Sequence, residues 1–161
     1  MDMIRHARMD DIDQLVELEA SCFPLAEAAT RTALAQRIQI FPHNFLVMEH
    51  EGQIIAMING CVCDQERMSD DLYENAQLHK PTGSYQAVFG LDVHPAYRHL
   101  GYAKDMMQAL IKQSIEDQKT GMFLTCKQHL IGFYESFGYV NMGISASIHG
   151  GVTWYDMLLT F

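Results

Sequence analysis

Residues 88–115, VFGLDVHPAYRHLGYAKDMMQALIKQSI, decide how this chain folds. They begin as an apolar strand that ends at His94-Pro95, continue through a short basic loop and become a helix. Apolar side chains recur with the helical period at Ala103, Met106, Met107, Leu110, Ile111 and Ile115. A strand that leads through a loop into a helix directs several backbone N–H groups to one point, and the helix dipole adds positive potential there. The stretch therefore predicts a site for an anion such as a phosphate.

The loop carries the pattern Arg98-x-x-Gly101-x-Ala103. Glycine at 101 lets the backbone approach a pyrophosphate closely, and the small Ala103 permits tight packing of the helix. The pattern is not a P-loop, since no Gly-Lys-Ser/Thr follows, and it has only one of the three glycines of the dinucleotide fingerprint. The alternative is an ordinary strand–turn–helix with one turn glycine.

The flanking residues favour a ligand. Arg-x-x-Gly-x-Ala after a strand that ends Leu-x-Val-x-Pro resembles the acetyl-coenzyme A site of the GNAT acetyltransferase superfamily. The resemblance implies that acetyl-CoA is bound, with backbone groups at the end of the strand holding its pantetheine arm and the loop cradling its pyrophosphate. The implied cofactor-binding residues are Leu91, Asp92, Val93, Arg98, His99, Leu100, Gly101, Tyr102, Ala103 and Lys104.

Composition limits the other classes of protein. With 161 residues and 48% hydrophobic content, the chain fits one domain over residues 1–161. No apolar run has the length of a membrane span and the first residues do not form a signal peptide, so we expect a cytoplasmic protein without membrane contact. The four cysteines form no Cys-x-x-Cys pair, and we expect neither a metal site nor a disulfide framework. A net charge of −9 argues against nucleic acid and suits a cationic substrate.

The order of predicted elements is strand, two helices, three strands, helix, strand, helix and two strands. We predict an α/β (α+β) fold in which helices flank a single twisted, mixed, mostly antiparallel sheet of about six to seven strands. The helices and strands outside the stretch just described are expected at 3–7, 12–20, 26–41, 45–48, 54–63, 70–77, 122–126, 129–137 and 139–161.

A second informative segment is IGFYESFGY, residues 131–139. Phe133 and Phe137 suit core packing, whereas Tyr134 projects in another direction with a hydroxyl that needs a partner. In the GNAT superfamily a tyrosine in this setting lies close to the sulfur of coenzyme A. The resemblance therefore implies that Tyr134 is the acid that protonates the departing thiolate; the alternative is a packing residue.

Further segments resemble the arylalkylamine (serotonin) N-acetyltransferase branch of this superfamily, over roughly residues 20–161. They are Phe23-Pro24-Leu25, Leu78-His79-Lys80-Pro81, Thr125-Cys126, Phe133-Tyr134-x-x-Phe137-Gly138-Tyr139 and Gly151-Val152-Thr153-Trp154. This resemblance implies that the substrate is bound by Phe23, Pro24, Leu25, Ala87, Phe89 and Thr125.

The chain departs from the branch at its catalytic base. Two histidines of the vertebrate enzymes correspond to Ala87 and Phe89, which cannot accept a proton. Some insect members use a glutamate after the first helix instead, and Phe23-Pro24-x-x-Glu27 resembles that segment. The resemblance thus implies Glu27 as the catalytic base. The alternative is that Glu27 is a charge in the first turn of a helix.

The leading hypothesis is an acetyl-CoA-dependent N-acetyltransferase that acts by direct transfer on a primary amine, arylalkylamine-like or otherwise small. One alternative is a transferase for peptide or protein amines. Another is an acyl-CoA-binding module with weak catalysis, given the missing histidines. The expected partners are acetyl-CoA and the amine, and the oligomeric state is left open, a homodimer included.

Overall fold

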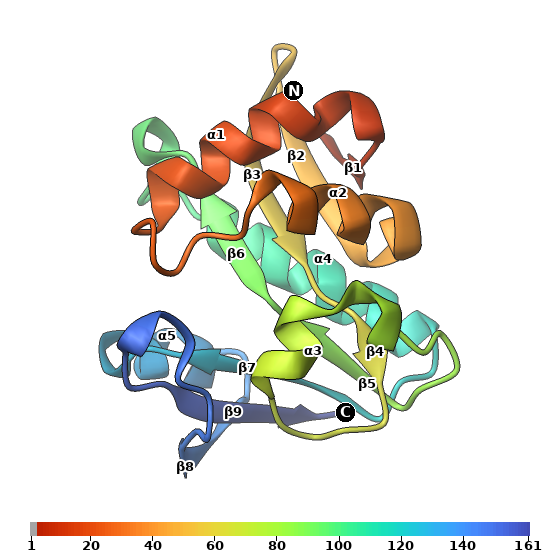
Figure 1. The fold of residues 1–161 in the computed structure, drawn as a ribbon, viewed down its shortest axis with the longest axis vertical. Coiled ribbons are helices and arrows are strands. Elements are labelled where there is room, and N and C mark those ends of the chain that lie inside the picture. The colour runs from red at the N-terminus through yellow and green to blue at the C-terminus, as the bar shows by residue number, and fades with distance from the viewer. Residues whose placement is uncertain (1–2) are drawn as a thin grey trace.

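Five α-helices and nine strands follow one another in residues 3–161, the part of the chain that the computed structural model describes (Figure 1). The helices are α1 (Ile12–Cys22), α2 (Arg31–Ile40), α3 (Asp70–Glu74), α4 (Tyr102–Glu116) and α5 (Ile131–Glu135). The strands are β1 (Met3–His6), β2 (Phe45–His50), β3 (Gln53–Asn59), β4 (Val62–Cys63), β5 (Tyr85–Val88), β6 (Gly90–Val93), β7 (Gly121–Cys126), β8 (Val140–Ile144) and β9 (Tyr155–Thr160).

The strands form two hydrogen-bonded sheets. The first has the order β1-β2-β3-β6, and its neighbouring strands are all antiparallel. The second has the order β4-β5-β7-β9-β8, in which β5 and β7 are parallel and the other pairs antiparallel. The predicted fold class, mixed α/β with mostly antiparallel pairing, is confirmed. The expected single sheet of six or seven strands is corrected to two sheets with nine strands in the described residues.

The reason for two sheets is a break in the apolar run that was expected to form one central strand. The chain leaves β5 at Val88 and enters β6 at Gly90, so that β5 lies between β4 and β7 while β6 pairs with β3. The segment that joins β3 to β4 passes close to the backbone of β5 near this point. A Cβ at Gly60 would lie only 1.8 Å from the carbonyl oxygen of Ala87, so this crossing requires glycine.

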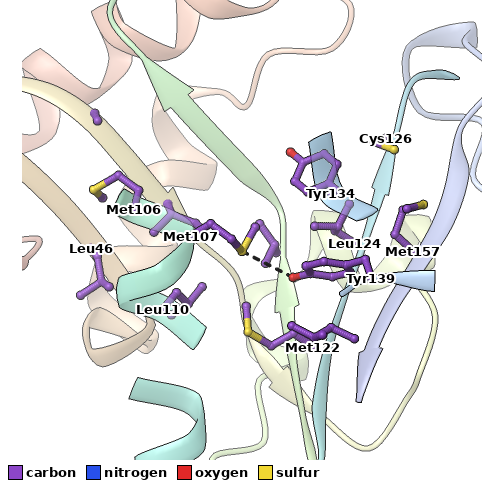
Figure 2. Packing of buried hydrophobic residues seen from close by; sticks show 14 of the residues in the cluster. Leu46, Met106, Met107, Leu110, Met122, Leu124, Cys126, Tyr134, Tyr139 and Met157 are labelled. Atoms are coloured by element: carbon purple, nitrogen blue, oxygen red, sulfur yellow. Dashed lines mark hydrogen bonds between the residues drawn. The ribbon is translucent and has the colours of Figure 1, made fainter. Parts of the chain in front are cut away.

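The first sheet is covered on both faces (Figure 1). Phe45 and Val47 of β2 belong to a buried cluster with side chains of α1 and α2, whereas Leu46 and Met48 pack with Met106, Met107 and Leu110 of α4. This alternation follows from the two-residue period of a strand. Burial on both faces explains why β2 and β3 are apolar at almost every position. Figure 2 shows the α4 side of this core, where the hydroxyl of Tyr139 donates to the sulfur of Met107 at 3.5 Å.

The second helix begins later than predicted. The hydroxyl of Thr30 accepts a hydrogen bond from the N–H of Ala33 at 3.2 Å and so caps α2 at Arg31. Residues 24–28 form a turn instead, in which the N–H groups of Glu27 and Ala28 donate to the carbonyl of Pro24. Glu27 therefore lies outside the helix, and its interpretation as a first-turn charge is wrong. None of the helices in residues 3–161 is long and apolar enough to cross a membrane.

Candidate active site

A cavity of about 590 Å³ lies where the two sheets separate, between β6 and the end of β7. We call this gap between the two strands the wedge. One end of the cavity reaches the start of α4, and the other end reaches α1, α3 and the segment between β8 and β9. Tyr134 of α5 lines the cavity together with residues of both strands. The cavity therefore joins the segments that the sequence analysis assigned to cofactor, catalysis and substrate.

The edge of β6 that faces the wedge has no strand beside it, because β6 is the last strand of its sheet. Val93 is paired with Ala56, and the N–H of His94 donates to the carbonyl of Ile55 at 2.7 Å. In an antiparallel ladder successive residues point their backbone groups to opposite sides. Leu91 and Val93 therefore direct their backbone N–H and C=O groups into the wedge, as a pantetheine arm would require.

The carbonyl of Val93 already has donors inside the protein. The Nε of Arg98 lies 3.2 Å from it, and the thiol of Cys22 lies 3.3 Å from it. A ligand amide that binds this carbonyl would share it with these groups or displace them. The exposed Arg98 side chain would then be free to approach a ligand phosphate.

The loop before α4 is shaped for an anion. Both His99 (φ +63°) and Gly101 (φ +87°) have left-handed backbone conformations. The first hydrogen bond of the helix joins the N–H of Asp105 to the carbonyl of Gly101 at 3.1 Å, so the N–H groups of Ala103 and Lys104 precede it. A Cβ built on Gly101 meets no protein atom within 4 Å, which leaves room for a ligand directly above the backbone. These features fit a pyrophosphate.

Most of the residues predicted to bind the cofactor line the cavity. These are Leu91, Val93, Arg98, His99, Gly101, Tyr102, Ala103 and Lys104. Asp92 and Leu100 lie outside it for opposite reasons. Asp92 is fully buried, because the strand turns its side chain away from those of Leu91 and Val93. Leu100 is 62% exposed and is not part of the cavity lining.

Tyr134 lines the cavity and lies beside Cys126 and Leu124 of β7 (Figure 2). Burial raises the pKa of Tyr134, and the nearby Cys126 and Asp92 raise it further. The phenol therefore holds its proton at neutral pH. Burial also raises the pKa of Cys126 to about 11, so this residue is a neutral thiol near pH 7 and not an activated nucleophile.

The far end of the cavity has aromatic walls. The lining there includes Phe23, Tyr73, Phe89, His149 and Trp154. The rings of Tyr73 and His149 have centroids 4.4 Å apart, and those of Tyr73 and Phe89 are 5.5 Å apart in an edge-to-face arrangement. The indole N–H of Trp154 donates to the carbonyl of His149 at 2.7 Å, which holds this segment in place. This end suits a ligand with an apolar or aromatic body.

Glu27 lines the cavity, but it has a partner. Its Oε1 atom lies 2.8 Å from the Nζ of Lys127, and its carbonyl accepts a hydrogen bond from the ring of His149 at 2.8 Å. A Cβ at Gly150 would lie 2.6 Å from the Cγ of Glu27, so the carboxylate side chain is also closely packed. The structure thus shows Glu27 as a buried member of an ion pair.

The residues predicted to bind substrate divide into two groups. Phe23, Phe89 and Thr125 line the cavity. Pro24 and Leu25 are exposed, Leu25 at 96%, because they form the outer side of the turn that precedes α2. Ala87 is fully buried in a cluster with Phe41 and Phe123 and does not reach the cavity.

Several residues that line the cavity were not predicted from the sequence. Glu19, Tyr73, Lys127, His149 and Trp154 all line the cavity. A signal for Glu19 was present in the sequence, because apolar residues at 12, 15 and 16 place position 19 on the same helical face. A carboxylate on that face is unusual. The other four come from α3, from the end of β7 and from the segment between β8 and β9, and no local pattern in the sequence connects them.

Comparison with known proteins gives the following matches. Residues 12–139 match the profile of the acetyltransferase (GNAT) family. The chain is 28% identical over 108 residues to serotonin N-acetyltransferase of Mesocricetus auratus, a match that covers 66% of this chain and 51% of that protein. It is also 28% identical over 114 residues to the probable hydrolase YhcX of Bacillus subtilis (strain 168), covering 66% of this chain and 22% of that protein. The chain thus spans about half, or less, of the length of these two relatives.

Solved structures share the fold over nearly the whole chain. The GphF GNAT-like decarboxylase in complex with isobutyryl-CoA has a TM-score of 0.82 at 21% identity, covering 98% of each chain. The putative acetyltransferase YncA of Salmonella typhimurium, solved with acetyl-CoA, has a TM-score of 0.70 at 15% identity, covering 99% of this chain and 93% of that one. The structural likeness shows the fold, the family profile matches most of the residues, and the chain belongs to the acetyltransferase (GNAT) family.

Proposed function

We propose that this protein is an acetyl-CoA-dependent N-acetyltransferase for a small primary amine with an aromatic or apolar body. The observation that carries the proposal is the cavity, whose lining includes the loop before α4, an aromatic chamber and Tyr134. Family membership and the relatives described above support the same reaction class.

The residues at the cofactor end would hold acetyl-CoA by its two polar parts. Backbone groups of Leu91 and Val93 would bind the pantetheine arm, and the N–H groups of the loop and the first turn of α4 would bind the pyrophosphate. Arg98 and Lys104 would add positive charge at the entrance. When bound, acetyl-CoA supplies an activated acetyl group as a thioester, so the protein has to position the amine, remove its proton and protonate the leaving sulfur.

Tyr134 is proposed as the acid for the sulfur. An acid must be protonated before it acts, and the raised pKa of this phenol keeps it so. The same burial disfavours a thiolate in this part of the cavity, so the departing sulfur needs a proton donor there.

Glu27 is the base that the resemblance implies, and it stays a prediction. If it accepted the amine proton, the half-buried Lys127 would lose its carboxylate partner at 2.8 Å. Such a loss is costly for a charge with limited access to water. A carboxylate that faces the cavity without a lysine partner is a better candidate for the proton acceptor.

The aromatic chamber favours a small amine over a peptide. A peptide substrate needs an open groove along which its backbone can lie. Here the rings of Tyr73, Phe89 and Trp154 line the acceptor end of the cavity.

The test is a turnover assay that follows release of free thiol from acetyl-CoA with arylalkylamines, polyamines and short peptides as acceptors. We expect the highest kcat/KM for arylalkylamines. A preference for peptides would support the peptide alternative, and acetyl-CoA binding without turnover on any amine would support a binding module.

A further inference from the structure

Two buried carboxyl groups lie against each other beside the wedge. Glu19 comes from α1 and is 4% exposed, whereas Asp92 comes from β6 and is fully buried. Both point toward Gly90, where a Cβ would lie 3.3 Å from Oδ1 of Asp92 and 3.8 Å from Oε1 of Glu19. Gly90 therefore lies directly beside both carboxyl groups. Both Gly90 and Glu19 line the cavity, so the pair borders the acceptor chamber.

The hydrogen bonds of the pair are incomplete. The Oε2 atom of Glu19 accepts the N–H of Ala29 at 2.8 Å. Neither carboxyl oxygen of Asp92 receives a hydrogen bond from any donor in residues 3–161. Two ionised carboxylates cannot bond to each other, but a proton on one of them turns it into a donor. Burial raises the pKa of Asp92 well above its usual range, and the charge and hydrogen bond of Glu19 raise it further. Asp92 is thus the member of the pair that carries a proton, with which it can donate a hydrogen bond to Glu19.

The surrounding charges agree with one proton on the pair. The buried guanidinium of Arg37 donates to neutral groups, the Asn59 side chain at 3.0 Å and the Tyr73 carbonyl at 3.3 Å. Its positive charge acts on Asp92 through space. One ionised carboxyl and one guanidinium leave this buried region neutral, whereas two ionised carboxyls would leave it negative.

We propose that Glu19 is the catalytic residue that binds the ammonium group of the acceptor and takes its proton, and that Asp92 is a positioning residue that donates a hydrogen bond to Glu19. The inference rests on the function proposed above and names the base of that site. One N–H proton of the ammonium passes to the carboxylate of Glu19, and the nitrogen keeps the electron pair with which it attacks. Glu19 later returns the proton to water.

Other groups near the pair contribute to its pH dependence. The thiol of Cys22 lies on α1, and the hydroxyls of Tyr73 and Tyr134 approach from α3 and α5. Both phenols have raised pKa values through burial first, so they are neutral where amines are acetylated. Of the two carboxyl groups, Glu19 is the one that lines the cavity, where an amine can reach it.

The main test is Glu19→Gln, which keeps the shape of the side chain and its acceptor for the N–H of Ala29. With an arylalkylamine, turnover at neutral pH should fall by roughly 10²–10⁴-fold, the range for a positioned base. With trifluoroethylamine, which is already unprotonated at neutral pH, the variant should approach the wild-type rate. Glu17→Gln is the matched control, because residue 17 is exposed on the same helix. Equal turnover by Glu19→Gln and Glu17→Gln would overturn the proposal.

Asp92 is tested by a pair of variants. Asp92→Asn carries an amide N–H that replaces the donated hydrogen bond, so most of the turnover should remain; Asp92→Leu cannot donate and should lose it. A loss in Asp92→Asn as large as that in Glu19→Gln would show that Asp92 must ionise, which contradicts its role as donor.

Wild-type protein provides a measurement that does not depend on whether variants fold. With a strongly basic arylalkylamine, kcat/KM should change little with pH around neutrality, because the ammonium form binds and Glu19 removes its proton. A rise in kcat/KM of about tenfold per pH unit, as expected when only free amine from solution reacts, would overturn the role of Glu19. Absence of turnover on every amine would overturn the proposed function and this inference together, whereas an active wild type with an unaffected Glu19→Gln variant would overturn the inference alone.

Discussion

Replacing Gly101 by valine should remove acetyl-CoA binding and leave the fold intact. The residue has φ +87°, which a β-branched side chain tolerates poorly, so Gly101→Val should lower the free energy of unfolding by about 1–2 kcal/mol. No protein atom lies within 4 Å of the added Cβ, and the new side chain would therefore extend into the space for the ligand. The strain is present in both the free and the bound protein, so the loss of affinity reports on the ligand contact.

The magnitude follows from the contacts that the side chain would block. If the pyrophosphate is pushed away from two backbone N–H groups, two hydrogen bonds to a charged partner are lost, each worth about 1.5–3 kcal/mol. The sum of about 3–6 kcal/mol corresponds to a loss of affinity of roughly 10²–10⁴-fold. Titration calorimetry with acetyl-CoA measures this difference directly.

Gly52→Val is the matched control for this experiment. Gly52 lies in the turn between β2 and β3, has φ +79°, and also has no protein atom within 4 Å of an added Cβ. Its stability cost should equal that of Gly101→Val, while its affinity for acetyl-CoA should match the wild type. A folded Gly101→Val variant with wild-type affinity would refute the assignment of the loop as the pyrophosphate site.

Three further results are expected. Tyr134→Phe should lower turnover by roughly 10²–10⁴-fold with acetyl-CoA affinity nearly unchanged by calorimetry; near-normal turnover would leave Tyr134 as a packing residue. Gly60→Ala should lower the free energy of unfolding in urea by about 1–3 kcal/mol or more, because its Cβ would lie 1.8 Å from a backbone oxygen of β5; unchanged stability would mean that this crossing adjusts freely. Burial opposes ionisation of Asp11, but hydrogen bonds from Arg5 and a backbone N–H outweigh it and lower its pKa. Asp11→Asn should therefore cost about 2 kcal/mol at pH 7, and the difference from wild type should shrink as pH falls through the lowered pKa, where Asp11 itself is protonated; a constant difference across pH would contradict this.

That the residues around Gly101 line the cavity could be predicted because this part of the lining is local in the sequence. The strand, the loop and the helix occupy one continuous stretch, and the helical period from Ala103 to Ile115 marks where the helix runs. The glycine in the motif is needed because residue 101 has a left-handed backbone conformation, which other residues rarely adopt. The geometry of a strand, a loop and a helix that follow one another is reflected in the pattern of consecutive residues.

The acceptor end could not be predicted in the same way, since distant segments build it. Residue 19 reaches residue 92, and residue 27 reaches residue 127, through the packing of α1 and the following turn against the two sheets. The resemblance selected Phe23-Pro24-Leu25 as a unit, yet only Phe23 faces the cavity, because a turn exposes its other two members. Which side of a turn faces a ligand depends on tertiary contacts that a short motif does not contain.

The break between β5 and β6 accounts for both the error in the fold prediction and the position of the site. An unbroken central strand would keep β6 beside β7, and the backbone groups of Leu91 and Val93 would then bond to that strand. Because the chain changes partners at Phe89, these groups face an open wedge. Gly90 follows the break directly and lies beside the carboxyl groups of Glu19 and Asp92. One interruption of a regular strand thus opens a backbone edge to the cavity and, in the proposed mechanism, brings a buried carboxylate to the amine.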